Sequence, residues 1–317
     1  MVSRHEYHGF YIFLNMKKII IFSSAIVLAA LAVFFVIRGC GPQSIQELPM
    51  VTVYRSQTGQ VEQLDLEQYL IGTVAAEMPA SFESEALKAQ AICARTYALR
   101  KLTEGKSYPR KADLSDDINS CQGYLNFEEF AQHHPYQSEQ WWLKIQQAVE
   151  ETRGQVILYD NQLIDALYHS TCGGQTASAL EVFGRDIDYL QSVKCGYCQI
   201  SQRYKTEQVL AWQEVEAVSG EGQSVEVMAT TSTGRNEQVR VNQKVMKGSE
   251  FRQAFALPST LCTVNMDKQG ISIISHGYGH GVGLCQYGAQ GMALQGKNYQ
   301  QILTYYYSRT RIYKIPY

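Results

Sequence analysis

The most extended hydrophobic pattern in the chain lies near its N-terminus. Residues 19–37 are nineteen consecutive uncharged positions, and they follow Lys17 and Lys18. A helix needs roughly 20 apolar residues to span a bilayer, whereas a secretory signal peptide has a shorter apolar core and small residues at its cleavage site. We therefore predict an uncleaved, single-pass anchor at 19–37. The lysines favour a cytoplasmic N-terminus at 1–18, which places the C-terminal domain in the periplasm or another extracytoplasmic space.

The chain beyond the anchor begins with a linker at 38–50 and then a predicted strand. Val51 to Arg55 alternates apolar and polar side chains, which is typical of a half-buried strand. Met16 is an alternative start of the chain, because residues 1–15 add nothing that a targeting or folded segment requires.

A first amphipathic helix is predicted from Asp65, which has capping-box spacing to Gln68, to Glu77. The residues of its mainly apolar face are Leu66, Tyr69, Leu70, Thr73 and Val74. Glu77 continues this face in the last turn, because Pro79 disfavours helix at the residue before it. Burial and the unpaired carbonyls of that turn both favour a neutral acid, so we predict a raised pKa for Glu77. From spacing alone, a partly solvated carboxylate without a chemical role is the more common explanation.

A second helix is predicted immediately afterwards, with Ser81 or Ser84 as its N-cap. Glu83 and Glu85 fall in its first turn, where negative charge is favourable, so we interpret both as structural. Its body, "EALKAQAICARTYALRKL", is rich in alanine, which lets another element approach closely. We expect this tightly packed helix to hold Glu77 in place.

The C-terminal part combines a strand-like "ISIIS" with a glycine-rich loop at 276–283 and a helix that begins near Cys285. The dinucleotide-binding motif needs glycines at its first, third and sixth positions, but the sixth position counted from Gly277 is Val282. No Gly-Lys-Ser/Thr sequence follows either, so we exclude a nucleotide loop. Glycines let a backbone approach a sugar closely. The residues that could then bind a glycan are Gly279, Gly281, His280, Gln286 and Tyr287; the alternative is a tight turn beside a core tyrosine.

Composition narrows the class of protein. The chain has 317 residues, of which 45% are hydrophobic and 18% charged, and its net charge is -2. This balance gives no broad basic field, so we predict no nucleic-acid partner. We expect an α+β fold, a mixed α/β ectodomain at 51–317, with a loop-rich insertion at about 103–140.

Two long motifs resemble a known family. They are "EMPASFESEALKAQAICARTYAL" and "GYGHGVGLCQYGAQGMALQGKNYQQILTYYY", with "YHSTCGGQTASALEVFG", "YLQSV" and "KGSEFRQAFALPSTL" between them in the expected order. Together they resemble the stage II sporulation protein D family, also called the amidase-enhancer family, over roughly residues 50 to 315. Two long ordered motifs are much more specific than a short pattern.

The resemblance implies a peptidoglycan lytic transglycosylase that cleaves glycan strands, stripped of their peptides, between MurNAc and GlcNAc. The glutamate of the EMP motif, here Glu77, would be its single acid/base and would leave 1,6-anhydroMurNAc ends. The resemblance implies no cofactor for catalysis and a cell-wall amidase as partner. It places Cys285 where relatives often carry serine, so we expect no nucleophilic role there. The alternative from another class is a non-enzymatic glycan-binding protein that activates an amidase.

Cysteines form a further pattern in the middle of the chain. His169-x2-Cys172 and Cys195-x2-Cys198 have the ligand types and the paired spacing of a Cys3His zinc site. In an oxidising compartment, a disulfide from Cys172 to Cys195 or Cys198 is the alternative. We predict that these residues act together as a structural zinc site that orients the "CGGQT" turn.

Overall fold

The structure is a computed structural model, and it describes residues 49–105 and 107–317. These residues contain both helices and strands, so the predicted α+β class is confirmed for the described part of the chain. No helix within that part is long and apolar enough to cross a bilayer. The predicted anchor at 19–37, the segment 1–18 before it and nearly all of the linker lie outside the described residues.

The N-terminal elements agree with the hydrophobic pattern. Strand β1 (Met50–Arg55) pairs antiparallel with β2 (Gln60–Asp65) and parallel with β3 (Leu114–Ser115). Strand β2 was not predicted, because all its side chains are exposed or only half buried and its sequence therefore lacks a clear apolar face. Helix α2 spans Leu66–Glu77 as expected, and the predicted apolar face is fully buried. The Asp65 side chain caps α2 by accepting a hydrogen bond from the Gln68 N–H at 3.0 Å.

Helix α3 (Ser84–Glu104) follows, but the predicted cap is wrong. Its N-cap is Glu83 rather than Ser81 or Ser84, and no side chain makes a cap bond there. The Glu83 N–H instead donates to Gln290 Oε1 at 2.7 Å. The Ala86 N–H, which a capping side chain could have accepted from, instead donates to the Glu83 carbonyl at 3.0 Å.

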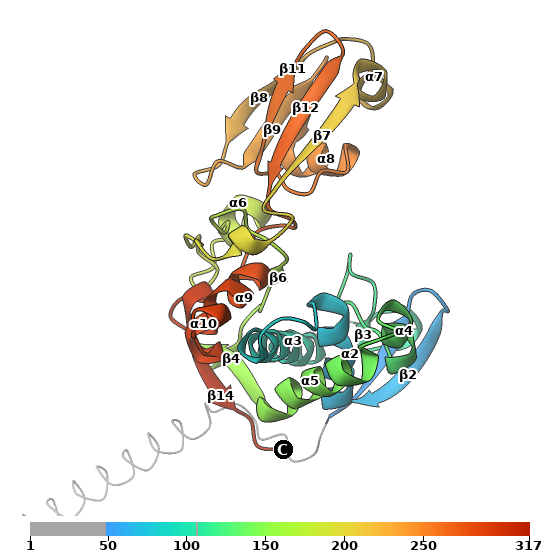
Figure 1. Cartoon of the computed structure of the whole chain (residues 1–317), viewed down its shortest axis with the longest axis vertical. Coiled ribbons are helices and arrows are strands. Elements are labelled where there is room, and N and C mark those ends of the chain that lie inside the picture. The colour runs from blue at the N-terminus through green and yellow to red at the C-terminus, as the bar shows by residue number, and fades with distance from the viewer. Residues whose placement is uncertain (1–48, 106) are drawn as a thin grey trace, which may run out of the picture. The chain divides into compact units, whose positions relative to one another are not determined.

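Helix α3 belongs to the larger hydrophobic cluster of the described residues and contacts several other elements of that cluster (Figure 1). It contacts α2, α5 (Ser138–Glu151), α9 (Gln286–Leu294), α10 (Tyr299–Tyr306) and β4 (Gln155–Tyr159). The predicted small residues permit this close packing, because each is fully buried: Ala86, Ala89, Ala91, Ala94 and Ala98.

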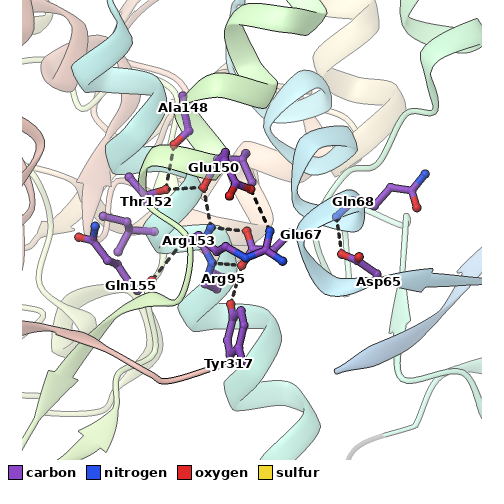
Figure 2. Close-up of polar contacts among 12 residues, drawn as sticks. Asp65, Glu67, Gln68, Arg95, Ala148, Glu150, Thr152, Arg153, Gln155 and Tyr317 are labelled. Carbon is purple, nitrogen blue, oxygen red and sulfur yellow. Dashed lines mark hydrogen bonds and ion pairs between the residues drawn. The ribbon is translucent and has the colours of Figure 1, made fainter. Parts of the chain in front are cut away.

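A buried ion pair fixes α2 against α3. Figure 2 shows the Arg95 guanidinium beside the Glu67 carboxylate, with Nε to Oε1 at 2.8 Å and Nη2 to Oε2 at 2.6 Å. The Tyr317 hydroxyl donates to Glu67 as well, so the last residue of the chain joins the same contact. A buried pair of this kind fixes geometry more reliably than it adds stability.

A second hydrophobic cluster is formed by another part of the chain. Its elements are β7 (Lys205–Ala211), α7 (Trp212–Ser219), β8 (Val225–Thr230), β9 (Asn236–Val241), β10 (Lys244–Lys247), α8 (Gly248–Ala254), β11 (Cys262–Met266) and β12 (Gly270–His276). They form two sheets with the orders β10-β9-β8 and β11-β12-β7. The predicted strand "ISIIS" is confirmed as part of β12, with Ile271 and Ile273 buried.

Short elements complete the described part. They are η1 (Pro109–Lys111), α4 (Phe127–His133), β5 (Gln162–Leu163), β6 (Tyr168–His169), α6 (Ala179–Phe183), η2 (Cys198–Ile200), β13 (Leu284–Cys285) and β14 (Arg311–Lys314). Strand β13 pairs parallel with β6, which brings the end of the glycine-rich loop beside Tyr168 and His169. This pairing joins the C-terminal family-like motif to the "YHSTCGGQT" segment.

Candidate active site at the end of α2

Glu77 is the last residue of α2, and its half-buried side chain lines a cavity of about 290 Å³. The other lining residues are Tyr97, Ile118, Asn119, Ser120, Cys121, Gln122, Ala166, Leu167, Tyr168, Phe183 and His280. Glu77 is the only carboxyl group among the described residues that line it. The cavity thus offers one carboxyl group for proton transfer, and its volume is close to the lower limit of the roughly 300–1,000 Å³ typical of ligand sites.

The environment of Glu77 favours its neutral form. Desolvation by burial raises the pKa of Glu77 above its usual range and outweighs two opposing contacts. The Gly123 N–H, which donates to Glu77 Oε1 at 2.6 Å, and the Tyr168 hydroxyl both lower that pKa. The predicted direction of the shift therefore agrees with the structure, and its largest cause is burial.

A segment of the predicted insertion supplies this backbone donor. Residues 122–125 cross α2 at Gly72, whose carbonyl accepts a hydrogen bond from the Leu125 N–H at 3.2 Å. A Cβ at Gly72 would lie 2.4 Å from both the Leu125 oxygen and the Tyr124 ring. Only glycine therefore allows the crossing, and the crossing brings Gly123 to Glu77.

Tyr168 is the second polar group facing Glu77. Its hydroxyl donates to Gln122 Oε1 at 3.0 Å, and burial raises the pKa of Tyr168 well above its usual value. The phenol consequently stays neutral, and its single proton is available either to Gln122 Oε1 or to a Glu77 carboxylate, whose pKa the hydroxyl lowers. The Gln122 amide is itself anchored, because its Nε2 donates to the Tyr69 hydroxyl at 3.3 Å and to the Ala94 carbonyl at 3.4 Å.

His280 lines the cavity, as the sequence suggested for a glycan-binding residue, but both ring nitrogens are already engaged. Nδ1 accepts from the Val282 N–H at 3.1 Å, so Nε2 carries the proton and donates to the Tyr168 carbonyl at 2.9 Å. Burial lowers the pKa of His280 to about 4, which keeps this neutral tautomer near neutral pH. In this arrangement His280 positions the Tyr168 backbone.

Gln286 and Tyr287, the other two predicted glycan-binding side chains, lie outside the cavity lining. Gln286 is buried, and its Nε2 donates to the Glu77 carbonyl at 2.9 Å and to Gln90 Oε1 at 3.3 Å. It therefore ties the first residue of α9 to the last residue of α2. Tyr287 packs edge-on against Phe82, with ring centroids 4.9 Å apart.

Gly279 and Gly281 have packing reasons to be glycine. Their φ angles are +110° and +85°, in the region that side chains rarely adopt. A Cβ at Gly279 would approach His169 Cβ to 3.0 Å, and one at Gly281 would approach Arg235 Nη2 to 2.7 Å. The close approach that the glycines allow is thus to the protein's own side chains.

The cysteines do come together, but with a different fourth residue. The Sγ atoms of Cys172, Cys195, Cys198 and Cys285 all lie within 4.8 Å of one another. His169, which the spacing placed in this set, is not part of it. Its Nδ1 hydrogen-bonds the Val282 carbonyl at 3.1 Å, and its ring lies 5.5 Å from that of His280. The β6–β13 pairing aligns Cys285 with His169, and this long-range contact is invisible in sequence spacing.

The disulfide alternative is not formed in the structure. The Sγ atoms of Cys172 and Cys198 are 3.4 Å apart, far beyond the roughly 2.05 Å of an S–S bond. All seven described cysteines are free thiols. The described part of the chain therefore presents a four-thiol cluster.

The two acids interpreted as structural have structural contacts. Glu85 Oε2 accepts from the Tyr299 N–H at 2.8 Å, and Glu85 Oε1 pairs with Lys88 at 2.8 Å. Glu83 supplies the backbone cap of α3. Neither residue lines the cavity that contains Glu77.

Sequence reasoning missed Gly123, Gln122 and Tyr168 as parts of this site. Tyr168 stands inside "YHSTCGGQT", directly before His169, so the motif itself carried a signal for it. Gly123 and Gln122 belong to the segment that was interpreted only as a loop-rich insertion, where no periodic pattern indicated a contact with α2.

Comparisons with known proteins agree with the motifs. Residues 54–159 match the family model described as SpoIID, stage II sporulation protein. Stage II sporulation protein D of Bacillus subtilis (strain 168) is 35% identical over 279 residues, which cover 86% of this chain and 81% of that protein. The protein of the same name from Bacillus amyloliquefaciens is 36% identical, over 85% of this chain and 80% of its own length. The amidase enhancer of Bacillus subtilis (strain 168) is 27% identical, over 77% of this chain and 40% of its own length.

Proposed function

Because the chain belongs to the stage II sporulation protein D family, we propose that it acts on the bacterial cell wall as a lytic transglycosylase of peptidoglycan glycan strands. The observation that carries this proposal is Glu77, a single carboxyl group with a raised pKa at the edge of a cavity. A glycosidase that uses water commonly needs two carboxyl groups. One acid/base suffices when the sugar supplies its own nucleophile.

In the proposed reaction, Glu77 first donates its proton to the glycosidic oxygen between MurNAc and GlcNAc as the bond to the anomeric carbon breaks. The resulting carboxylate then accepts the proton of the MurNAc 6-hydroxyl, whose oxygen bonds to the anomeric carbon. The products are a 1,6-anhydroMurNAc end and a free GlcNAc hydroxyl. No water is consumed, and Glu77 regains its proton for the next cycle.

The neighbours of Glu77 suit both halves of this cycle. Burial keeps the acid protonated before the first step, and the Gly123 N–H at 2.6 Å stabilises the carboxylate between the two steps. The Tyr168 hydroxyl stabilises the same charge. Gln286 fixes the backbone of Glu77 by donating to its carbonyl, so the carboxyl group keeps a defined position.

The alternative is a glycan-binding protein that stimulates a cell-wall amidase without cleaving glycan. The amidase enhancer name of one relative favours this alternative, although this chain spans only 40% of that protein.

Under either function we propose a cell-wall amidase as a partner and an extracytoplasmic location. A reporter fused after Tyr317 should be active outside the cytoplasm, and strong cytoplasmic activity would contradict this topology.

The test of the function compares the parent with Glu77→Gln on purified glycan strands stripped of peptides. Glutamine keeps the shape and hydrogen-bonding capacity but cannot deliver the proton, so cleavage should fall by roughly two to four orders of magnitude while glycan binding persists. Release of anhydromuropeptide ends is measured by mass spectrometry, and binding by pull-down on the insoluble polymer.

Glu83→Gln and Glu85→Gln are the matched controls, because both acids are near Glu77 in the sequence but do not line its cavity. They should retain most of the cleavage activity. If Glu77→Gln cleaves as fast as the parent while one control does not, the acid has been assigned to the wrong residue. If every protein leaves glycan intact yet stimulates an amidase, the non-enzymatic alternative is correct.

A further inference from the structure

Four cysteine sulfurs lie close together at a site that has no role in the proposed cleavage reaction. They come from the "CGGQT" turn, the "CGYC" loop and the residue that caps α9. Each of these cysteines is at most 1% exposed, and their Sγ atoms lie within 4.8 Å of one another. Sulfurs that surround one metal ion tetrahedrally at about 2.3 Å stand about 3.8 Å apart. The 3.4 Å between Cys172 Sγ and Cys198 Sγ and the upper limit of 4.8 Å for all pairs bracket that spacing.

Two backbone N–H groups and a hydroxyl lie within hydrogen-bonding distance of the sulfurs. The N–H groups of Cys172 and Gly288 each donate to Cys285 Sγ at 3.3 Å. The Tyr306 hydroxyl lies 3.1 Å from Cys195 Sγ. Donors arranged in this way stabilise thiolates, which are the form that binds metals.

A buried cation stands next to the cluster. Arg235 is 2% exposed, its Nη2 donates to the Cys172 carbonyl at 3.3 Å, and its Nε has no hydrogen-bond partner among residues 49–105 and 107–317. Among the described residues, no carboxylate lies within ion-pair distance of Arg235. A buried guanidinium without a carboxylate is costly unless another negative group compensates it. Four thiolates around one divalent ion carry two net negative charges and would provide that compensation.

We propose that Cys172, Cys195, Cys198 and Cys285 bind one zinc ion in a closed, structural tetrathiolate site. The site has no open position for water or substrate, because all four ligands come from the protein. Sulfur ligands in a tetrahedron also suit iron, so the metal must be identified directly.

The zinc would tie distant segments together and support the candidate active site. Cys285 directly precedes Gln286, whose amide donates to the Glu77 carbonyl at 2.9 Å. Metal binding at Cys285 therefore fixes the start of α9 and, through Gln286, the end of α2. In this role the metal positions Glu77 and does not touch the substrate. The zinc site itself does not depend on the proposed cleavage reaction.

The test uses the full-length chain, purified in detergent without chelator or reductant. Elemental analysis should find about one zinc per chain, and a thiol reagent should leave the cluster thiols unmodified until a strong chelator is added. Cys198→Ala should reduce the zinc content at least tenfold. Cys262→Ala is the matched control, because Cys262 is also buried but bonds Asn236 outside the cluster.

If Cys198→Ala does not fold, the parent alone still decides the question. Chelator should lower its Tm, and added zinc should restore it, whether or not the protein cleaves glycan. Parent protein without zinc whose cluster thiols react freely would overturn the proposal. The proposal would also be overturned if mass spectrometry showed the parent lighter by the two hydrogens lost on forming a disulfide, or if elemental analysis found iron in place of zinc.

Discussion

Glu77 and the four-cysteine cluster are two polar sites that the neighbouring residues Cys285 and Gln286 connect. Cys285 belongs to the cluster, and Gln286 donates to the Glu77 carbonyl. The Glu77 carboxyl group is half buried, faces a cavity and receives one backbone hydrogen bond, from Gly123 at 2.6 Å. The cysteine sulfurs are closed off from solvent and face one another. A group that must exchange a proton with a substrate needs an open side and a pKa near the working pH. A group that holds geometry does not need access.

The largest expected effect is that of Gly288→Ala, which should disturb the cysteine cluster. A Cβ there would lie 2.0 Å from the Tyr306 hydroxyl oxygen and 2.8 Å from Cys195 Sγ. Because both neighbours are buried and would have to shift, we expect a loss of about 3 kcal/mol in the free energy of unfolding, together with loss of the proposed zinc. Denaturant unfolding and elemental analysis measure the two quantities.

Gly196→Ala is the matched control for that change. Gly196 lies between Cys195 and Cys198, yet no heavy atom of the described residues, its chain neighbours aside, is within 4 Å of the Cβ that alanine would add. Its stability should stay within about 0.5 kcal/mol of the parent. Equal losses in the two variants would mean that the close packing around the cluster does not hold it together.

The next effect concerns the other site, through Gly72→Ala. The new Cβ would collide with the Leu125 carbonyl oxygen and the Tyr124 ring at 2.4 Å, so the crossing segment must move away from α2. Gly123 would then lose its contact with Glu77. Cleavage should fall roughly 10- to 100-fold, because small displacements at a reacting group are costly. The initial rate of anhydro-end release on stripped glycan is the measurement.

Gln68→Gly controls for helix stability in that experiment. Gln68 is exposed on the same helix, so the substitution should cost about 1 kcal/mol without moving the crossing segment. Its cleavage rate at a temperature where it is fully folded should match that of the parent. A rate reduced as much as in Gly72→Ala would show that α2 stability, and not the crossing, controls activity.

These glycines also show how far sequence patterns reach. The apolar face of α2, the end of the helix at Glu77 and the strand "ISIIS" followed from periodicity and from Pro79, which act over a few residues. Gly123 and Cys285 could not be placed in this way. Gly123 reaches Glu77 only because the chain crosses α2 at Gly72, and Cys285 joins the cluster only through the pairing of β13 with β6.

His169 is a residue that sequence spacing placed in the metal site and that the structure places elsewhere. Its spacing to Cys172 is that of a metal-ligand pair, but its Nδ1 hydrogen-bonds the Val282 carbonyl, and its Nε2 has no hydrogen-bond partner in the described part of the chain. Local spacing predicts which residues could meet, whereas strand pairing decides which do. At Glu77 the structure confirms the helix end and the raised pKa, whereas the catalytic role that the motifs imply stays a prediction.

A smaller effect is expected from Gln286→Leu, which breaks the link between the two sites. The substitution removes the donor to the Glu77 carbonyl and leaves Gln90 Oε1 without this contact. We expect a loss of about 1–2 kcal/mol in transition-state stabilisation, mainly in kcat, because the carboxyl group is less well positioned. Steady-state kinetics on stripped glycan separate kcat from KM.

Gln290→Leu is the control on the same helix. Gln290 is also buried, but its Oε1 accepts from the Glu83 N–H, whereas Gln286 donates to the Glu77 carbonyl. Its stability should fall by a similar amount while kcat stays near that of the parent. A change confined to KM in Gln286→Leu would indicate that Gln286 acts on substrate binding rather than on the position of Glu77.

The smallest effect is expected from Tyr168→Phe, read as a change in the pH dependence of cleavage. Burial raises the pKa of Glu77, and the Tyr168 hydroxyl partly offsets that rise by stabilising the carboxylate. The proposed reaction needs the protonated acid, so the rate should fall as pH rises through the pKa of Glu77, on the alkaline limb of the profile. Removing the hydroxyl removes a contact that lowers this pKa, so the alkaline limb should move to higher pH, by less than about one unit for one lost hydrogen bond.

Tyr159→Phe is the control for this experiment. It changes a tyrosine that donates to Asp188 outside the cavity, so it should leave the pH profile unmoved. A shift of the limb to lower pH would mean that the phenol stabilises the protonated acid, and its assigned role at Glu77 would have to be reversed.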